Sequence, residues 1–164
     1  MNRLVLPSPV GPLTLVSDEG KLVGCYFSNN EFAKQKLADY GQPEGANDPV
    51  LKAASNELKL FFAQRLKKFT IPVAPSGTEF QRSVWKALQK IPFGKTASYG
   101  DIARQVGKPN AMRAVGAANK RNPICIIIPC HRVIGADGSL TGFGGGIGRK
   151  KYLLALERGD SLPF

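Results

Sequence analysis

The sequence predicts an α+β protein: a small N-terminal α/β domain with an antiparallel sheet, and a mainly helical, winged-helix-like C-terminal domain with a helix-turn-helix. Three observations predict this class. Short apolar segments separated by turn residues fill the start of the chain, apolar residues at helical spacing dominate the remainder, and a Pro- and Gly-rich connector ends at residue 77. We therefore expect two domains, residues 1–77 and residues 78–164.

The N-terminal sheet is predicted from three apolar segments. Residues 3–6 and 13–16 flank a turn rich in proline and glycine, which is typical of paired strands, and residues 21–27 add a third segment. Residues 69–73 predict a last strand before the connector. A small antiparallel sheet follows from these segments.

One amphipathic helix is predicted between the third strand and the connector. Its apolar residues recur at helical spacing: Leu51, Ala54, Leu58, Phe61 and Phe62. Asp48 stands before Pro49, and an N-cap followed by proline at the first helical position is a typical helix start. We expect this helix to cover the sheet.

The C-terminal domain is predicted to open with another helix. Thr78 and Gln81 have the spacing of a capping box. The apolar face that follows comprises Phe80, Val84, Leu88 and Ile91. Trp85 lies near this face, where a core role is favoured over base stacking.

Two shorter helices follow with helix-turn-helix spacing. Ser98 is placed to cap a helix that continues through Val106. Residues 107–109 break it, and Asn110 is placed to cap a second helix that ends at about Lys120. By itself this spacing is compatible with DNA binding and with plain helix packing.

The second of these two helices is rich in small residues, which would let its backbone approach DNA closely. Arg113 is the long side chain able to enter a groove or the base stack, so DNA binding should be weakly sequence-specific. The alternative is a small-residue face packed against another helix. The candidate DNA-binding residues are Ala111, Arg113, Ala114, Gly116 and Lys120.

The positive charge is concentrated in the C-terminal half. The chain has a formal net charge of +11; residues 1–77 carry 9 Lys and Arg against 7 Asp and Glu, whereas residues 78–164 carry 14 against 5. This asymmetry favours a polyanionic partner, most often nucleic acid, bound through phosphate neutralisation. The alternative is a basic surface that only keeps the protein in solution.

A cysteine and the chain's one histidine are adjacent, as Cys130 and His131. A thiol becomes a good nucleophile as the thiolate, and an imidazole can accept its proton. Neighbouring side chains of an extended segment point apart, so we expect a water molecule to link the two, with Glu157 as a candidate to orient the imidazole. The alternatives are a buried cysteine beside a surface histidine, and a metal site that also uses Cys125.

Three cysteines, Cys25, Cys125 and Cys130, make an odd count, so we expect no disulfide framework. Cys25 and Cys125 fit buried positions. No apolar run is long enough to cross a bilayer, and the first residues lack the apolar stretch of a signal peptide. We therefore expect a soluble, intracellular, cytoplasmic protein with no membrane partner.

The segment Pro129-Cys130-His131-Arg132-Val133-Ile134-Gly135 resembles the active-site signature of the O6-alkylguanine-DNA alkyltransferases, also called methylated-DNA–protein-cysteine methyltransferases. The resemblance covers residues 78–159 strongly and the first half loosely. Further family features occur in the same order at residues 80–81, 84–85, 91–94, 98–99, 113–116, 122–123, 142–146 and 153–157.

The resemblance implies a role for each matching side chain. Cys130 is similar to the alkyl acceptor, His131 to the water-linked base, and Glu157 to the carboxylate that orients that histidine. Tyr99 is similar to the phenol that contacts the flipped base and helps to neutralise the departing guanine. Arg113 resembles the arginine that fills the stack when the damaged base leaves it.

The resemblance also implies a guanine pocket. Asn122 is similar to the asparagine that shapes the turn supporting the active-site segment. The loop at 142–146 and backbone groups of the acceptor segment would line the pocket, so its candidate residues are Val133, Phe143, Gly144 and Gly145. Phe143 stands where the family commonly has tyrosine, and Gly144 adds no side chain, so the tolerance of bulky alkyl groups stays open.

The function implied by the resemblance is DNA repair by direct, stoichiometric transfer of an alkyl group from O6-alkylguanine in duplex DNA to Cys130, with base flipping and irreversible self-inactivation. O4-alkylthymine stays open as a further substrate, and cooperative assembly of the expected monomer on DNA is also open. We expect no cofactor and no metal. The alternatives are a non-catalytic alkyltransferase-like protein, a class that lacks the acceptor cysteine, and a cysteine hydrolase.

Overall fold

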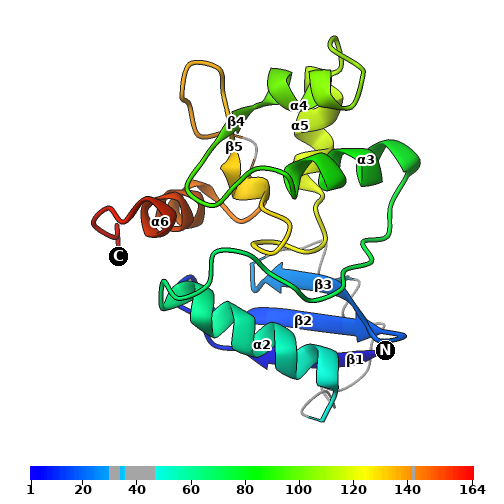
Figure 1. Cartoon of the computed structure of the whole chain (residues 1–164), viewed down its shortest axis with the longest axis vertical. Helices are drawn as coiled ribbons and strands as arrows, with labels where there is room; N and C mark the ends of the chain where they lie inside the picture. The colour runs from blue at the N-terminus through cyan, green and yellow to red at the C-terminus, as the bar shows by residue number, and fades with distance from the viewer. Residues whose placement is uncertain (30–33, 36–46, 142) are drawn as a thin grey trace. The chain divides into compact units, whose positions relative to one another are not determined.

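A computed structural model describes residues 1–29, 34–35, 47–141 and 143–164 of the chain (Figure 1). These residues form two compact units. The first contains Met1–Pro75 together with Pro123–Cys125, and the second contains Ser76–Asn122 together with Ile126–Phe164. The first unit has a sheet with a helix and the second is mainly helical, which confirms the predicted α+β class.

The sheet of the first unit has three antiparallel strands in the order β1, β2, β3. They span Asn2–Leu6, Leu13–Asp18 and Lys21–Phe27, as the apolar segments predict. A bulge between Val16 and Ser17 shifts the pairing of β2 with β3. The later segment Pro123–Cys125 pairs with β3 through Cys25, whose backbone N–H donates to the carbonyl of Pro123 at 2.8 Å.

The predicted last strand at residues 69–73 is wrong. Only Val73 is paired there, in an isolated parallel bridge with Leu22. The Leu22 N–H donates to Pro72 O and the Ala74 N–H donates to Leu22 O, both at 2.9 Å. Proline has no N–H to donate, and with Pro72 and Pro75 beside the bridge the pairing does not extend into a strand.

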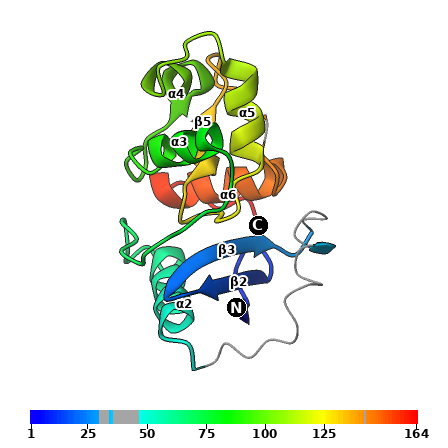
Figure 2. The same ribbon diagram turned by 90° about the vertical axis from the view of Figure 1, so that its right-hand side faces the viewer.

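Helix α2, Pro49–Phe62, lies along one face of the sheet (Figure 2). Its start is the predicted one, since the Asp48 side chain accepts hydrogen bonds from the N–H groups of Val50 and Leu51. The buried face includes most of the predicted apolar positions: Leu51, Ala54, Leu58 and Phe61. The helix covers the sheet because this face packs against β2 and β3.

The second unit is built from α3 (Glu79–Leu88), α4 (Tyr99–Gln105), α5 (Met112–Lys120) and α6 (Ile147–Arg158). The helices α3, α4 and α5 pack against one another (Figures 1 and 2). Two short strands pair in parallel, β4 at Ala97–Ser98 and β5 at Val133–Ile134. No helix within the described ranges is long and apolar enough to cross a membrane.

Two predicted helix starts of the second unit are confirmed. Thr78 and Gln81 form the capping box of α3. Ser98 caps α4, with Asp101 completing a second capping box. Trp85 is buried in the core and its indole N–H donates to Ala118 O at 2.8 Å, as expected for an enclosed tryptophan.

The predicted cap of α5 is wrong. Ala111, not Asn110, occupies the N-cap position, and no side chain among the described residues caps the first turn. The Ala111 N–H donates to Lys108 O at 2.9 Å, so the chain is still completing a turn at Ala111 and the helix begins at Met112. The Asn110 side chain therefore lies one residue too early to cap it.

Candidate active site

Residues 130–132, which we call the acceptor turn because the resemblance implies an alkyl acceptor at Cys130, form a short turn of helix. Residues Cys130–Arg132 form the 3-10 helix η1 between Pro129 and β5. The Arg132 N–H donates to Pro129 O at 3.0 Å. The expected extended segment is therefore wrong, because the restricted backbone of Pro129 opens a tight turn.

Both side chains of the adjacent pair are enclosed. Cys130 is 2% exposed and His131 is 0% exposed. The alternative of a buried cysteine beside a surface histidine is therefore wrong. Successive side chains point to opposite faces in a strand. Cys130 and His131 lie in the turn η1, so this alternation does not separate their side chains.

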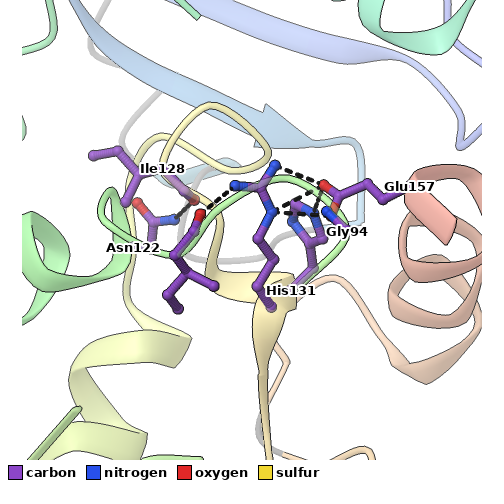
Figure 3. A network of polar contacts seen from close by, with 7 residues as sticks. Gly94, Asn122, Ile128, His131 and Glu157 are labelled. Atoms are coloured by element: carbon purple, nitrogen blue, oxygen red, sulfur yellow. Dashed lines mark hydrogen bonds and ion pairs between the residues drawn. The ribbon is translucent and has the colours of Figure 1, made fainter. Parts of the chain in front are cut away.

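The structure brings His131 to the carboxylate of Glu157 on α6, although 26 residues separate them (Figure 3). His131 Nε2 lies 2.6 Å from Glu157 Oε1. A carboxylate only accepts, so Nε2 carries the proton and donates, and Nδ1 is left as an acceptor. His131 Nδ1 is buried and has no partner within the part of the chain that the structure describes.

Burial keeps the imidazole neutral. It lowers the pKa of His131 below its usual value; the hydrogen bond and charge of Glu157 oppose the shift, and the cations of Arg132 and Lys150 add to it. A neutral imidazole with a free lone pair on Nδ1 is able to accept a proton.

The Glu157 carboxylate is held by several donors besides His131. Arg132 donates from Nε to both carboxylate oxygens at 3.0 and 2.9 Å, and from Nη2 to Oε1 at 2.8 Å. The Gly94 N–H donates to Oε2 at 3.2 Å (Figure 3). Burial raises the pKa of Glu157, but His131 and Arg132 outweigh it and bring the pKa to about 2. Glu157 is therefore a fixed anion at neutral pH.

Lys150 of α6 is fully buried beside the acceptor turn. Its Nζ donates to Val133 O and, at 3.1 Å, to Thr141 O. Burial lowers the pKa of Lys150, and the negative charge of the Cys130 thiolate opposes that shift. A charged Lys150 therefore favours the thiolate form of Cys130.

Tyr99, at the start of α4, reaches the same loop. Its hydroxyl donates to Thr141 O at 2.5 Å. Burial raises the pKa of Tyr99, and the negative charge of the Cys130 thiolate adds to the increase. The phenol therefore keeps its proton at neutral pH and acts as a hydrogen-bond donor.

The candidate pocket loop lies against the end of α5. Val133, Phe143 and Gly145 are buried and Gly144 is exposed, while Gly142 lies outside the described residues. A Cβ at Gly144 would meet Lys120 O at 3.0 Å, which is closer than ordinary van der Waals contact. Glycine at this position therefore allows the loop to approach the helix backbone.

Asn122 supports the segment that leads to the acceptor turn. It is buried, and its Nδ2 donates to Ile128 O at 2.7 Å (Figure 3). Between these two residues Ile126 has a backbone φ of 72°, a conformation that β-branched residues rarely adopt. Strain of this kind is held only where surrounding contacts enforce it.

The α5 helix has a buried face and an exposed face. Val115, Ala118 and Asn119 are buried. Of the candidate DNA-binding residues, Arg113, Ala114 and Lys120 are exposed and Ala111 and Gly116 are half-buried. The alternative of a small-residue face packed against another helix is therefore wrong for Ala114.

Several residues of this site were missed by the sequence analysis. Arg132 lies inside the signature segment, but nothing in its spacing indicates that it holds Glu157. Lys150 could have been noticed, because it stands at helical spacing from the buried Leu153 and Leu154. The partners of Gly94 and Asn119 are distant in sequence and carry no local signal.

Cys25, Cys125 and Cys130 are all buried, and none of the three is part of a disulfide. No cluster of three His, Cys, Asp or Glu side chains within the described ranges could hold a metal. Cys25 lies inside β3, and Cys125 pairs through its backbone with Cys25.

Fold and site together define a two-unit protein with a helix-turn-helix beside a buried cysteine, histidine and glutamate. The family model described as "6-O-methylguanine DNA methyltransferase, DNA binding domain" matches residues 79–159, and that described as "6-O-methylguanine DNA methyltransferase, ribonuclease-like domain" matches residues 2–75. The chain belongs to the 6-O-methylguanine DNA methyltransferase family, which confirms the resemblance seen in the sequence.

Curated relatives cover almost the whole chain. A protein of Methanosarcina acetivorans named methylated-DNA–protein-cysteine methyltransferase is 48% identical over 157 residues, which are 96% of this chain and 98% of the relative. A protein of the same name from Mycobacterium tuberculosis is 47% identical over 154 residues, 93% of this chain and 90% of the relative.

Solved structures share the fold. Mycobacterium tuberculosis OGT in complex with DNA is 44% identical and superposes with a TM-score of 0.84 over 97% of this chain and 94% of that one. An O6-methylguanine DNA methyltransferase from Methanococcus jannaschii is 31% identical, with a TM-score of 0.69 over 98% of this chain and 96% of that one.

Proposed function

We propose that the chain is a methylated-DNA–protein-cysteine methyltransferase that binds DNA and repairs it by moving an alkyl group from O6-alkylguanine to Cys130. Membership in the family supports the reaction class. The observation that carries the assignment to residues is the buried Cys130 beside His131, whose Nε2 is tied to Glu157 and whose Nδ1 is left as an acceptor.

The first step is formation of the thiolate. The Cys130 thiol gives its proton to a water molecule, which passes a proton to Nδ1 of His131. The imidazolium that forms keeps its Nε2 proton directed at Glu157, a permanent anion that stabilises it. Lys150 adds a positive charge near the thiolate.

The second step is displacement at the alkyl carbon. The thiolate forms the S–C bond while the bond between O6 of guanine and the alkyl carbon breaks, and the electron pair leaves with guanine. A donor must neutralise that developing charge, and we assign this role to the Tyr99 hydroxyl, whose proton turns from Thr141 O to the departing guanine. The product is a thioether, and no group in the proposed mechanism restores the thiol, so each molecule acts once.

Base flipping is needed because Cys130 is enclosed. With 2% of its surface exposed, it does not reach an alkyl carbon on a base stacked within duplex DNA. We assign Arg113, exposed on α5, to fill the gap in the stack, and the half-buried Gly116 and exposed Ala114 to let the backbone approach the groove. Unstacking requires a few kcal/mol, part of which the inserted side chain offsets.

We assign DNA binding and alkyl transfer to residues 78–164, the basic half of the chain, acting as a monomer. Residues 1–77 form the N-terminal domain. O4-alkylthymine is a second candidate substrate, since its alkyl group is also attached to an exocyclic oxygen.

Mass spectrometry after incubation with duplex DNA containing O6-methylguanine tests the proposal. We expect a gain of one methyl group on Cys130 and none in Cys130→Ser, which should still bind the duplex. Binding without any mass gain would instead favour the non-catalytic lesion-binding alternative. Repeated turnover of acyl substrates would favour a cysteine hydrolase.

A further inference from the structure

Asn119 is a buried polar side chain that the proposed reaction does not use. It lies in the last turn of α5, is 1% exposed, and is buried together with Val115 and Ala118. An apolar side chain would be buried there without loss of polar hydration, and asparagine is a weaker helix former than alanine. Neither helix formation nor packing therefore accounts for an amide at this position.

The two ends of the Asn119 amide have different surroundings. Its Nδ2 donates to the backbone carbonyl of Cys130 at 3.3 Å. A carbonyl only accepts, so this contact assigns the nitrogen and leaves Oδ1 as an acceptor. Oδ1 is buried and meets no donor among the residues that the structure describes.

The second unit has one other buried polar side-chain atom without a partner in its described part, Nδ1 of His131. Both atoms are acceptors. His131 directly follows Cys130 in the chain, and the Asn119 side chain is hydrogen-bonded to the Cys130 carbonyl. A buried acceptor that receives no hydrogen bond loses its hydration without compensation and destabilises the fold. Both acceptors lie on residues that adjoin or contact Cys130, so its thiol, or a water molecule bound to the thiol, is the donor that would satisfy them.

On the basis of the proposed function, we infer that Asn119 is a positioning residue for alkyl transfer. Its Nδ2 ties the acceptor turn η1 to α5, and its Oδ1 accepts a hydrogen bond from the thiol, or from a water molecule bound to it, until His131 takes the thiol proton. Because α5 also carries Arg113, one helix then holds both the proposed stack filler and the backbone of Cys130.

Two substitutions separate the two halves of the amide. Asn119→Leu keeps the size and removes both the donor and the acceptor. Asn119→Asp keeps the size and the acceptor oxygens, removes the donor, and adds a negative charge beside the thiol. The other titratable and charged groups around Cys130 stay unchanged in both variants; they are Tyr99 on α4, His131 and Arg132 on η1, and Lys150 and Glu157 on α6.

Single-turnover transfer is measured for both variants from pH 6 to 9, with free O6-benzylguanine and with an O6-methylguanine duplex, alongside duplex affinity. Misplacement of the thiol should slow Asn119→Leu on both substrates by roughly 10- to 100-fold, with duplex affinity unchanged. In Asn119→Asp the added charge raises the pKa of the thiol, so the pH profile should move upward by about one unit or more.

Val115→Ala is the matched control, because it removes buried bulk from the same helix and keeps the hydrogen bond from Asn119 to the Cys130 carbonyl. It should lower the thermal midpoint and leave both transfer rates per folded protein unchanged. Wild-type rates in Asn119→Leu, rate losses in Val115→Ala equal to those of Asn119→Leu, or an unshifted pH profile in folded Asn119→Asp would each overturn the inference. A wild-type protein that never alkylates Cys130 would instead refute the proposed function.

Discussion

Glu157 is the residue on which the polar contacts of the site converge. Its two oxygens accept hydrogen bonds from His131, Arg132 and the Gly94 N–H. Burial of a carboxylate is unfavourable unless the carboxylate is paired. At Glu157 the contacts with His131 and Arg132 outweigh the effect of burial, because they bring its pKa to about 2 from the usual 4.5. The same residue therefore orients the proposed base and contributes to the stability of the fold.

Glu157 should make stability depend on pH. Because its folded pKa lies below the unfolded value, its contribution of about 3 kcal/mol is present above pH 4.5 and is lost as the pH falls through about 2. We expect the free energy of unfolding of the wild type to exceed that of Glu157→Gln by less at pH 3 than at pH 6. Urea unfolding at the two pH values measures this difference, and a gap that does not narrow would contradict the assigned pairing.

The Tyr99 hydroxyl should matter for the chemical step. Tyr99→Phe deletes one donor near the leaving guanine and keeps the ring, so we expect single-turnover transfer to slow by about 100-fold, with most duplex affinity retained. Rapid-quench transfer and a binding titration on the same duplex separate the two effects. An unchanged transfer rate would remove Tyr99 from the mechanism.

Two helices bring the site together. The α6 helix carries Lys150 and Glu157 on its buried face, and α5 presents Asn119 inward and Arg113 outward. The last turn of α5 also faces the loop at Gly144 closely enough that a Cβ would meet Lys120 O at 3.0 Å. The α5 helix therefore contacts Cys130 on one side and exposes Arg113 on the other. This arrangement suits the proposed coupling of DNA binding to alkyl transfer.

The exposed arginine of α5 should matter only on duplex DNA. Arg113→Ala removes the proposed stack filler, so we expect weaker duplex binding and a larger loss of transfer with duplex substrate than with free O6-benzylguanine. Comparison of the two substrates in single-turnover assays measures the difference. Lys120→Ala, also exposed on α5, is the control and should weaken duplex binding without changing transfer at saturating DNA. Equal losses of Arg113→Ala on both substrates would argue against stack filling.

At the scale of the whole molecule, the charge is divided unevenly. Residues 78–164 carry 14 Lys and Arg against 5 Asp and Glu, and residues 1–77 carry 9 against 7. Basic side chains that neutralise phosphates release counterions from DNA, so binding by such a half depends on salt.

Duplex affinity should therefore fall steeply as salt is added, whereas transfer from free O6-benzylguanine should respond weakly because that base carries no phosphate. Titrations across a salt series measure the first and single-turnover rates the second. A duplex affinity that is insensitive to salt would contradict DNA binding by the basic half.

The repair product should reach a limit set by the amount of protein. Since the thioether on Cys130 is stable, we expect about one equivalent of product per protein however large the excess of alkylated DNA. Product counted against active protein over extended times measures this limit. Sustained turnover beyond one equivalent would rule out self-inactivation.

Local signals in the sequence were sufficient for most of the fold. Short apolar segments around turn residues predicted β1 to β3. The Asp48-Pro49, Thr78-Gln81 and Ser98 signals predicted three helix starts, because caps and amphipathic faces depend on neighbours within a few positions. Where a local signal was weak the prediction failed, as at Asn110 and at residues 69–73, where turn geometry and proline decided the outcome.

The sequence by itself determined the α+β class, the helix-turn-helix and the family, and it predicted the pair Cys130 and His131 as the centre of the site. Only the tertiary structure decided that His131 is buried against Glu157, that Arg132 shares that carboxylate, and that Lys150 and Asn119 face the acceptor turn. The reason is physical. Adjacency and periodicity are written along the chain, whereas the burial of a charge and the identity of its partner depend on which distant helix packs against the turn.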